Sequence, residues 1–176
     1  MDAFTHVIIT APSPDLAAVY QSQIEFIRSE LPCLRNSHLL CVADPCGVRI
    51  GSGGGTLNAL HHLDLIIGRK ALSKAKVAII HSGGDSKRAP FHTVCGKAWA
   101  SINAVQSDRL LATPLSMLIA ELSMFCRNIL SSSYPLGSIV VASSDVMLDI
   151  CISDGIIFFH LISSLELILI VLSCSL

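Results

Sequence analysis

The sequence predicts an α/β fold with a mostly parallel sheet, and two features of the first 150 residues support this prediction. Short runs rich in β-branched residues alternate with longer segments in which apolar residues recur every three or four positions. The short runs are bounded by glycine, proline or serine, as expected of buried strands that end in turns. Strands that alternate with helices are typical of layered domains in which helices cover a parallel sheet.

The first strand is expected over Phe4 to Thr10, and a helix follows it. Ser13 has a side chain suited to an N-cap, and Pro14 suits the first helical position. The apolar residues beyond them recur at helical spacing until Pro32 ends the pattern. These residues are Leu16, Val19, Tyr20, Ile24, Ile27 and Leu31.

Two further strands and a second helix are expected between residues 39 and 80. The strands are Leu39 to Ala43 and Val77 to Ile80. A glycine-rich loop is expected at Gly51 to Gly55, and the helix between the strands then runs from Thr56 to Gly68. In the simplest structural interpretation the loop is a flexible turn, and Thr56 caps the helix that follows.

A third helix and a fourth strand complete the pattern. Thr113 and Pro114 repeat the cap-then-proline start of a helix. One continuous apolar stripe follows, made of Leu115, Leu118, Ile119, Leu122, Phe125, Cys126 and Ile129. The run from Ser138 to Ala142 is expected to be a strand, and Asp145 follows it at the position where an open sheet usually carries its chemistry.

Composition and charge exclude several classes of protein. The 176 residues suffice for one ordinary domain or for the first part of a larger one. Twelve Lys and Arg against 13 Asp and Glu give a formal charge of −1, so nucleic acid is not an expected partner. Seven cysteines without a CxxC pair, after an N-terminus without a signal-peptide pattern, predict reduced thiols and a cytoplasmic protein. Structural zinc is not expected, because His61 and His62 are adjacent and cannot share one helix face.

The segment from Ile156 to Leu172 differs from the rest of the chain. It is almost wholly apolar, lacks caps and turn residues, and is interrupted by His160, Glu166 and two serines. A membrane anchor needs about 20 apolar residues, and a central Glu costs about 3 kcal/mol in the bilayer, so membrane association through this tail is not expected. A C-terminus unrelated to the domain is the favoured interpretation, ahead of a core element and a membrane anchor.

The clearest functional signal is the segment over residues 81–97, which follows a predicted strand. It combines two consecutive glycines with the cations Lys87, Arg88 and Lys97. Glycines let the backbone approach phosphate oxygens, and cations neutralise phosphate charge. Arg88 can bind phosphate through two N–H groups, and Lys97 would act as a point charge. The composition suits a triphosphate, and it fits a solvated Gly-Ser turn flanked by surface cations equally well.

Two other phosphate-binding motifs fit poorly. A P-loop needs Ser or Thr after its Gly-Lys pair, but Ala98 follows Lys97, and Phe91 stands at the position of the first glycine. In a dinucleotide-binding fingerprint that starts at Gly51, Thr56 stands in place of the third glycine, and no acidic residue follows at the expected distance of about 20 residues.

Two segments closely resemble the glycine-rich signatures of the L-fucokinase/GDP-fucose pyrophosphorylase family. They are DPCGVRIGSGGGTLNAL over residues 44–60 and IIHSGGDSKRAPFHTVCGK over residues 79–97. The resemblance covers about residues 4 to 150 and implies a mostly parallel, three-layer nucleotidyltransferase-like (Rossmann-like) sheet that is incomplete. It implies a domain over 1–150 and a tail over 151–176 that does not match the family. It also implies a truncated chain, because the family's sugar pocket and kinase domain lie C-terminal to this point.

The resemblance implies a transferase that converts GTP and fucose 1-phosphate into GDP-fucose and pyrophosphate. It assigns nucleotide binding to Gly51, Gly53, Gly54, Thr56, Gly83, Gly84, Asp85, Ser86 and Lys87. Arg88 and Lys97 would stabilise charge on the leaving pyrophosphate, and Asp145 would hold Mg²⁺. Asp145 would otherwise cap a turn at the strand end, and it follows Ser144 where the family usually has glycine.

Two alternatives stay open beside this function. A non-catalytic truncated paralogue or interaction fragment would account for an unrelated tail. A dinucleotide-binding oxidoreductase would bind a nicotinamide cofactor and be indifferent to Mg²⁺. The residues themselves name neither the base nor the sugar, so another nucleoside triphosphate such as ATP remains possible.

Overall fold

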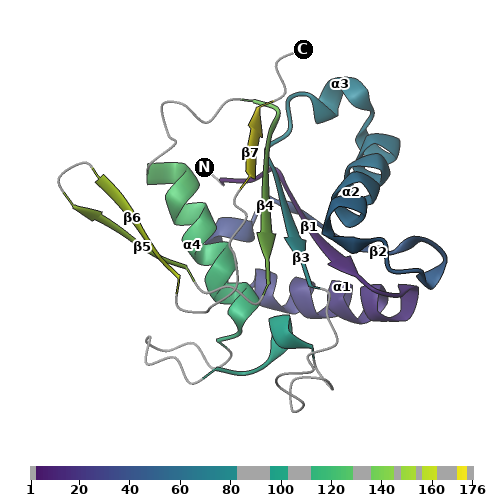
Figure 1. Ribbon diagram of the computed structural model, residues 1–176, viewed down its shortest axis with the longest axis horizontal. Helices are drawn as coiled ribbons and strands as arrows, with labels where there is room; N and C mark the ends of the chain where they lie inside the picture. Colours follow the sequence, from purple (N-terminus) through teal and green to yellow (C-terminus); the bar gives the residue numbers. More distant parts are fainter. Residues whose placement is uncertain are drawn as a thin grey trace.

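The computed structural model describes residues 3–82, 96–102, 112–128, 136–144, 148–153, 156–161 and 170–173. Its main sheet has the strand order β2-β1-β3-β4-β7 (Figure 1). The bounds are β1 His6–Ala11, β2 His38–Ala43, β3 Val77–His81, β4 Ser138–Ser143 and β7 Ile170–Ser173. The first four strands are parallel, and β7 is antiparallel to β4. The predicted α/β fold with a mostly parallel sheet is confirmed.

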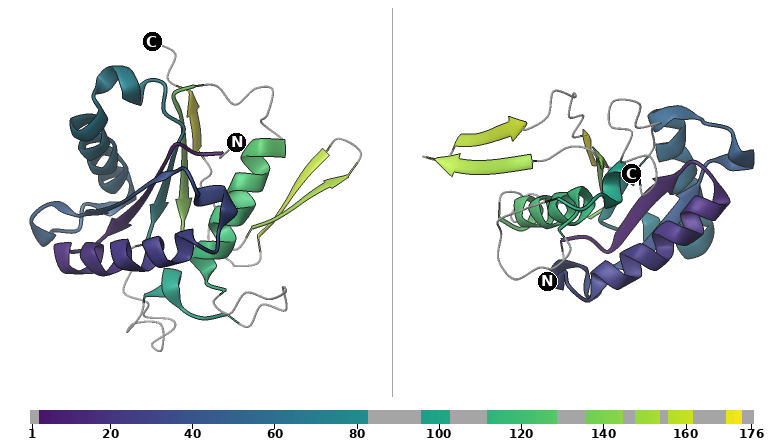
Figure 2. Two further views of the ribbon diagram at one scale, coloured as in Figure 1. Left: turned by 180° about the vertical axis from the view of Figure 1, so that it is seen from behind. Right: turned by 90° about the horizontal axis from the view of Figure 1, so that it is seen from below.

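Seven helical segments and a hairpin accompany this sheet in the described part of the chain. The α-helices are α1 Pro14–Arg28, α2 Gly51–Ile67, α3 Arg69–Leu72 and α4 Pro114–Asn128. The short 3₁₀ helices are η1 Pro32–Leu34, η2 Pro45–Gly47 and η4 Lys97–Trp99. The hairpin pairs β5 Leu148–Ser153 with β6 Ile156–Leu161 and forms a separate two-stranded sheet. Figures 1 and 2 show α2 on one side of the main sheet and α4 on the other.

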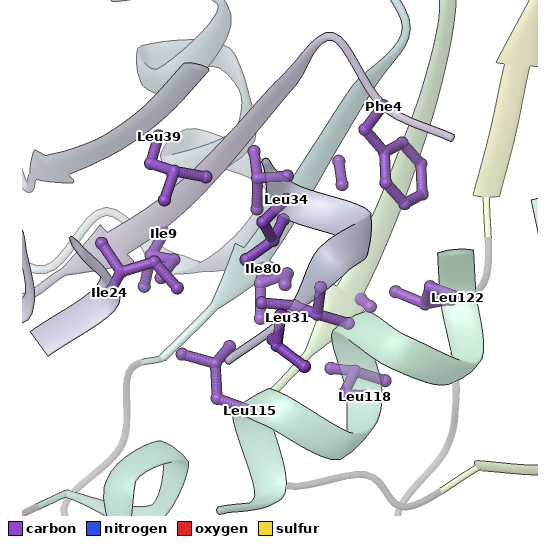
Figure 3. Packing of buried hydrophobic residues seen from close by; sticks show 14 of the residues in the cluster. Phe4, Ile9, Ile24, Leu31, Leu34, Leu39, Ile80, Leu115, Leu118 and Leu122 are labelled. Atoms are coloured by element: carbon purple, nitrogen blue, oxygen red, sulfur yellow. The ribbon is translucent and has the colours of Figure 1, made fainter. Parts of the chain in front are cut away.

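Alternation along the strands produces two separate cores, one on each face of the sheet. Neighbouring residues of a strand point to opposite faces. Thus Ile80 belongs to the core under α1, η1, η4 and α4, whereas Ile79 belongs to the core under α2. Figure 3 shows the first core, in which Leu31 lies between Ile80 and the helix residues Leu115 and Leu118. Burying one such side chain stabilises the fold by about 2 kcal/mol.

Both helix starts that were predicted from a cap and a proline are confirmed. The Ser13 hydroxyl oxygen accepts a hydrogen bond from the Leu16 N–H at 3.3 Å, with Pro14 at the first helical position. In α4 the Thr113 hydroxyl oxygen accepts from the Ser116 N–H at 3.1 Å, and the Ser116 hydroxyl oxygen accepts from the Thr113 N–H at 2.9 Å. These reciprocal bonds satisfy N–H groups that have no partner within the helix.

The prediction of a glycine-rich loop at residues 51–55 is wrong, because α2 already begins at Gly51. Thr56 is not the cap of this helix: its hydroxyl donates to the Ser52 carbonyl oxygen at 3.0 Å, from within the helix. Glycine disfavours helix by only about 1 kcal/mol per residue, and tertiary contacts override this cost. A Cβ at Gly54 would lie 2.8 Å from Ile50 Cβ, so the close packing at this turn needs glycine there.

The apolar tail supplies part of the sheet. β7 lies within it and pairs with β4 in the register Val140 with Val171 and Val141 with Ile170. This pairing agrees with the interpretation of the tail as a core element, which was placed second to an unrelated C-terminus in the sequence analysis. The boundary at residue 150 stays a prediction. Across the described ranges no helix is both long and apolar enough to cross a membrane.

Candidate functional site

The carboxyl ends of the four parallel strands share one edge of the sheet, and polar residues gather there. The strands end at Ala11, Ala43, His81 and Ser143, and the arrowheads of β3 and β4 point to the same side in Figure 1. In open parallel sheets ligands bind outside this edge. The carboxyl edge of the sheet is therefore the candidate site.

His81 links the sheet to helix α2 at this edge. It pairs with Thr10 of β1 in the strand register, and its Nδ1 lies 3.1 Å from the Thr10 hydroxyl oxygen. Its Nε2 lies 2.9 Å from the Thr56 hydroxyl oxygen of α2. The ring is therefore held from both sides by hydroxyl groups, one from a strand and one from the helix.

The surroundings of His81 keep its ring neutral. Burial lowers the pKa of His81 below its ordinary value, and the nearby Asp44 carboxylate raises it by a smaller amount. Burial disfavours the charged form of imidazole because the cation loses hydration. His81 therefore carries one ring proton at physiological pH.

Helix α2 presents an uncapped N-terminus at the carboxyl edge. Its N-cap residue is Ile50, which makes no side-chain hydrogen bond to the helix, and among the described residues no atom would contact a Cβ at Gly51 or Gly53. The Asn58 amide donates to the Ala43 carbonyl oxygen at 2.9 Å, which fixes the helix beside the end of β2. The first N–H groups of a helix have no partner within it and carry partial positive charge, so they suit an anion such as phosphate.

The structure brings some of the predicted site residues together. Gly51, Gly53, Gly54 and Thr56 lie in the first two turns of α2. Lys97 begins η4, whose Ala98 and Trp99 belong to the core under α1 and α4, on the other face of the sheet. A ligand that binds both the start of α2 and Lys97 would have to extend across the carboxyl edge of the sheet. The remaining candidates lie outside the described residues, and their roles stay predictions: Gly83, Gly84, Asp85, Ser86, Lys87, Arg88 and Asp145.

Gly96 shows why the chain can turn into η4 beside α1. Its φ is +77°, in the left-handed region that favours glycine, and a Cβ there would lie 3.0 Å from the Tyr20 hydroxyl oxygen. The Tyr20 and Trp99 rings are 5.4 Å apart between centroids. Lys97 is thus placed by a glycine turn packed on an aromatic pair.

Sequence reasoning did not single out Thr10, Asp44 and His81 as site residues. Each is polar and stands at or beside the C-terminal end of a predicted strand. Position at a strand end could have identified these residues, because parallel sheets bind ligands at their carboxyl edge. In the sequence analysis this criterion was used for Asp145 alone.

Metal binding has no full set of ligands in the described part of the chain. No group of three or more His, Cys, Asp or Glu side chains there could hold a metal ion. Mg²⁺ takes one or two carboxylates, with water and phosphate oxygens as its other ligands. The expected ligand Asp145 lies outside the described residues, so the magnesium site stays a prediction.

The fold and this edge define the class of protein, which is a doubly wound α/β domain with its candidate site at the carboxyl ends of the parallel strands. The chain matches the fucose pyrophosphorylase domain family over residues 69–164, more than half of its length. It therefore belongs to that family. The match extends past the domain boundary expected at residue 150.

Several curated proteins are similar to this chain. The bifunctional fucokinase/GDP-fucose pyrophosphorylase of Arabidopsis thaliana is 30% identical over 121 residues, which cover 58% of this chain and 12% of that protein. The fucose-1-phosphate guanylyltransferase of Mus musculus is 36% identical over 98 residues, covering 54% and 16%. The L-fucokinase/L-fucose-1-P guanylyltransferase of Bacteroides fragilis is 28% identical over 122 residues, covering 66% and 13%.

The chain spans 12 to 16% of the length of these relatives. Their names describe the activities of much longer proteins. No solved structure is similar enough to count as a match. The comparisons therefore establish the family of this chain and leave its own activity as a separate question.

Proposed function

We propose that this chain forms the nucleotide-phosphate side of a sugar-1-phosphate guanylyltransferase site that uses GTP and fucose 1-phosphate. The supporting observation is the glycine-rich, uncapped start of α2 at the carboxyl edge of the sheet. Free N–H groups, open space at Gly51 and Gly53, and a helix dipole together suit phosphate oxygens. The names of the relatives support the choice of guanylyl and fucosyl groups.

In the proposed reaction an oxygen of fucose 1-phosphate attacks the α-phosphorus of GTP. The bond between the α-phosphorus and the bridging oxygen to the β-phosphate breaks, and pyrophosphate leaves with the electron pair. Such transfers depend on positioning and on stabilising the negative charge that develops on the phosphates. Arg88 and Lys97 would provide that stabilisation, while Gly83, Gly84 and the α2 turn would provide N–H donors.

Mg²⁺ is part of the proposal, with Asp145 as its ligand. Asp145 follows Ser144 in the sequence, and the Ser144 N–H donates to the His81 carbonyl oxygen at 2.9 Å, so the described chain reaches the carboxyl edge one residue before Asp145. One carboxylate with phosphate oxygens and water is an ordinary ligand set for this ion. When bound, Mg²⁺ would offset the negative charge of the triphosphate.

A cytoplasmic location is also proposed. In the described part of the chain, the free cysteines are Cys33, Cys41, Cys46 and Cys126. Free thiols are expected of a protein in a reducing compartment. A net charge of −1 gives no attraction to nucleic acid.

Calorimetric titration of GTP into the full chain, with and without Mg²⁺, tests this proposal. We expect binding that depends on Mg²⁺ and that weakens about ten-fold or more in Arg88→Ala and in Lys97→Ala, because each change removes a charged phosphate contact. Lys74→Ala is the matched control, since Lys74 is an exposed cation beyond α3 and away from the site. If the folded chain binds neither GTP nor ATP, the proposal is contradicted and the non-catalytic alternative is favoured.

A further inference from the structure

The direction of one hydrogen bond to His81 is fixed by its neighbours. The Thr56 hydroxyl donates to the Ser52 carbonyl oxygen at 3.0 Å. A hydroxyl group has one proton to donate. The same hydroxyl oxygen lies 2.9 Å from His81 Nε2, so in that bond it must accept. Nε2 therefore carries the ring proton.

The direction of the second hydrogen bond follows. A neutral imidazole has one donor nitrogen and one acceptor nitrogen. With the proton on Nε2, Nδ1 accepts from the Thr10 hydroxyl at 3.1 Å. The bonds form one directed series from Thr10 through His81 and Thr56 to the Ser52 carbonyl, and the series joins β1, β3 and α2.

The imidazole ring also packs against the backbone of α2. Gly55 is buried, and a Cβ there would lie 3.2 Å from His81 Cε1 and 3.4 Å from Nδ1. His81 thus contacts the helix at residue 55 and binds it at residue 56. Both contacts lie directly after the first turn, residues 51–54, and the bond from the Thr56 hydroxyl to the Ser52 carbonyl oxygen reaches back into that turn.

We propose that His81, as the neutral tautomer protonated at Nε2, is a positioning residue that fixes the glycine-rich first turn of α2 for phosphate binding. Consecutive glycines give this turn high backbone freedom. A site that binds phosphate through N–H groups gains most when those groups are held in place beforehand. The inference rests on the proposed function for its ligand, whereas its geometry rests on the described hydrogen bonds.

The tautomer is tested by nitrogen NMR of the His81 ring in the full chain without nucleotide. Near neutral pH we expect a protonated Nε2 and an unprotonated Nδ1. A proton on Nδ1, or on both nitrogens, would overturn the directed series of bonds. This measurement does not depend on any ligand.

The positioning role is tested with His81→Leu and His81→Gln. Leu removes both ring bonds, whereas Gln keeps a donor and an acceptor. In His81→Leu we expect amide hydrogen exchange at residues 55–58 to become about five-fold faster, and GTP to bind about five- to ten-fold more weakly, as the loss of the one ring bond to α2, at Thr56, predicts. In His81→Gln both values should return most of the way to those of the unchanged protein.

Thr5→Val is the matched control at the opposite edge of the sheet. The Thr5 hydroxyl donates to the Lys76 carbonyl oxygen at 3.0 Å, so this variant also loses a hydroxyl bond. Exchange at residues 55–58 should not change in it. If His81→Leu does not fold, Thr10→Val and Thr56→Val remove the same bonds one at a time and are measured in the same way.

The outcomes separate the two proposals. If the unchanged protein binds no GTP, the proposed function fails, and the exchange rates still decide whether His81 holds α2. If a folded His81→Leu protein shows unchanged exchange at residues 55–58, the positioning role is wrong whatever the GTP affinity. If exchange rises but GTP affinity stays the same, His81 holds the turn without serving the ligand, and the proposal as stated is overturned.

Discussion

The two edges of the sheet use their polar side chains in different ways. At the amino edge the Thr5 hydroxyl bonds both the N–H and the carbonyl oxygen of Lys76, at 2.9 and 3.0 Å, and the rings of His6 and His38 stack at 5.1 Å. At the carboxyl edge the bonds of Thr10, His81 and Thr56 hold a helix whose own N-terminus has no cap.

The difference indicates which edge is built for a ligand. At the amino edge the Thr5 hydroxyl bonds the backbone of Lys76, just before β3, and so serves the fold. At the carboxyl edge the hydroxyl bonds support a helix turn whose first N–H groups have no partner within the helix. Under the proposed function, a phosphate would bind the first N–H groups of α2 at the carboxyl edge.

The largest expected effect comes from crowding the carboxyl edge. Gly55→Val should lower the free energy of unfolding by about 3 kcal/mol, because the added side chain meets the His81 ring and its β-branch is restricted within a helix. Urea denaturation followed by circular dichroism measures this change. A loss under about 1 kcal/mol would show that His81 can move away from the helix, and the contrast between the edges would weaken.

The next effect tests the amino edge. Thr5→Ala removes a hydroxyl that both donates and accepts, so we expect a loss of about 2 kcal/mol in the free energy of unfolding. GTP affinity in the folded protein should be unchanged. An altered affinity in this variant would mean that the two edges are not functionally separate.

A smaller effect of opposite sign is expected at Gly53. Gly53→Ala should raise the free energy of unfolding by about 0.5 kcal/mol, because alanine favours helix and no atom of the described residues lies within 4 Å of its Cβ. The same methyl group would occupy the space in front of the helix start, so GTP should bind about ten-fold more weakly. Thermal unfolding and calorimetry on one preparation test both parts. A variant that is more stable and binds GTP normally would argue against phosphate binding at α2.

The smallest effect concerns pH. Burial is the main cause of the lowered pKa of both His6 and His81; His38 lowers the pKa of His6 further, while Asp44 partly opposes the shift at His81. Below about pH 6.5 the unfolded chain therefore binds protons that the folded protein does not, so the free energy of unfolding decreases as the pH falls from there.

Denaturation midpoints between neutral pH and about pH 5 measure this dependence. His81→Gln should reduce the slope, and His6→Gln should reduce it separately, because each removes one titrating ring. A double variant that keeps the full slope would assign the dependence to other groups.

The elements with local signals could be predicted from the sequence alone. Ser13 with Pro14, and Thr113 with Pro114, predicted two helix starts, because a cap and the amide that it binds lie three residues apart. Short runs of β-branched residues bounded by turn residues predicted the parallel strands, because these signals also lie within a few residues of one another. Two glycine-rich signatures led to the family.

The start of α2, the hydrogen bonds of His81 and the pairing of β7 depend instead on contacts between distant parts of the chain. Thr10 and His81 are 71 residues apart in sequence, and Thr56 and His81 are 25 apart. Five residues rich in glycine predict a loop when local propensity is considered alone, since glycine is a poor helix former. Close packing against Ile50 favours glycine at Gly54, and close packing against His81 favours it at Gly55; these partners are not evident until the chain has folded.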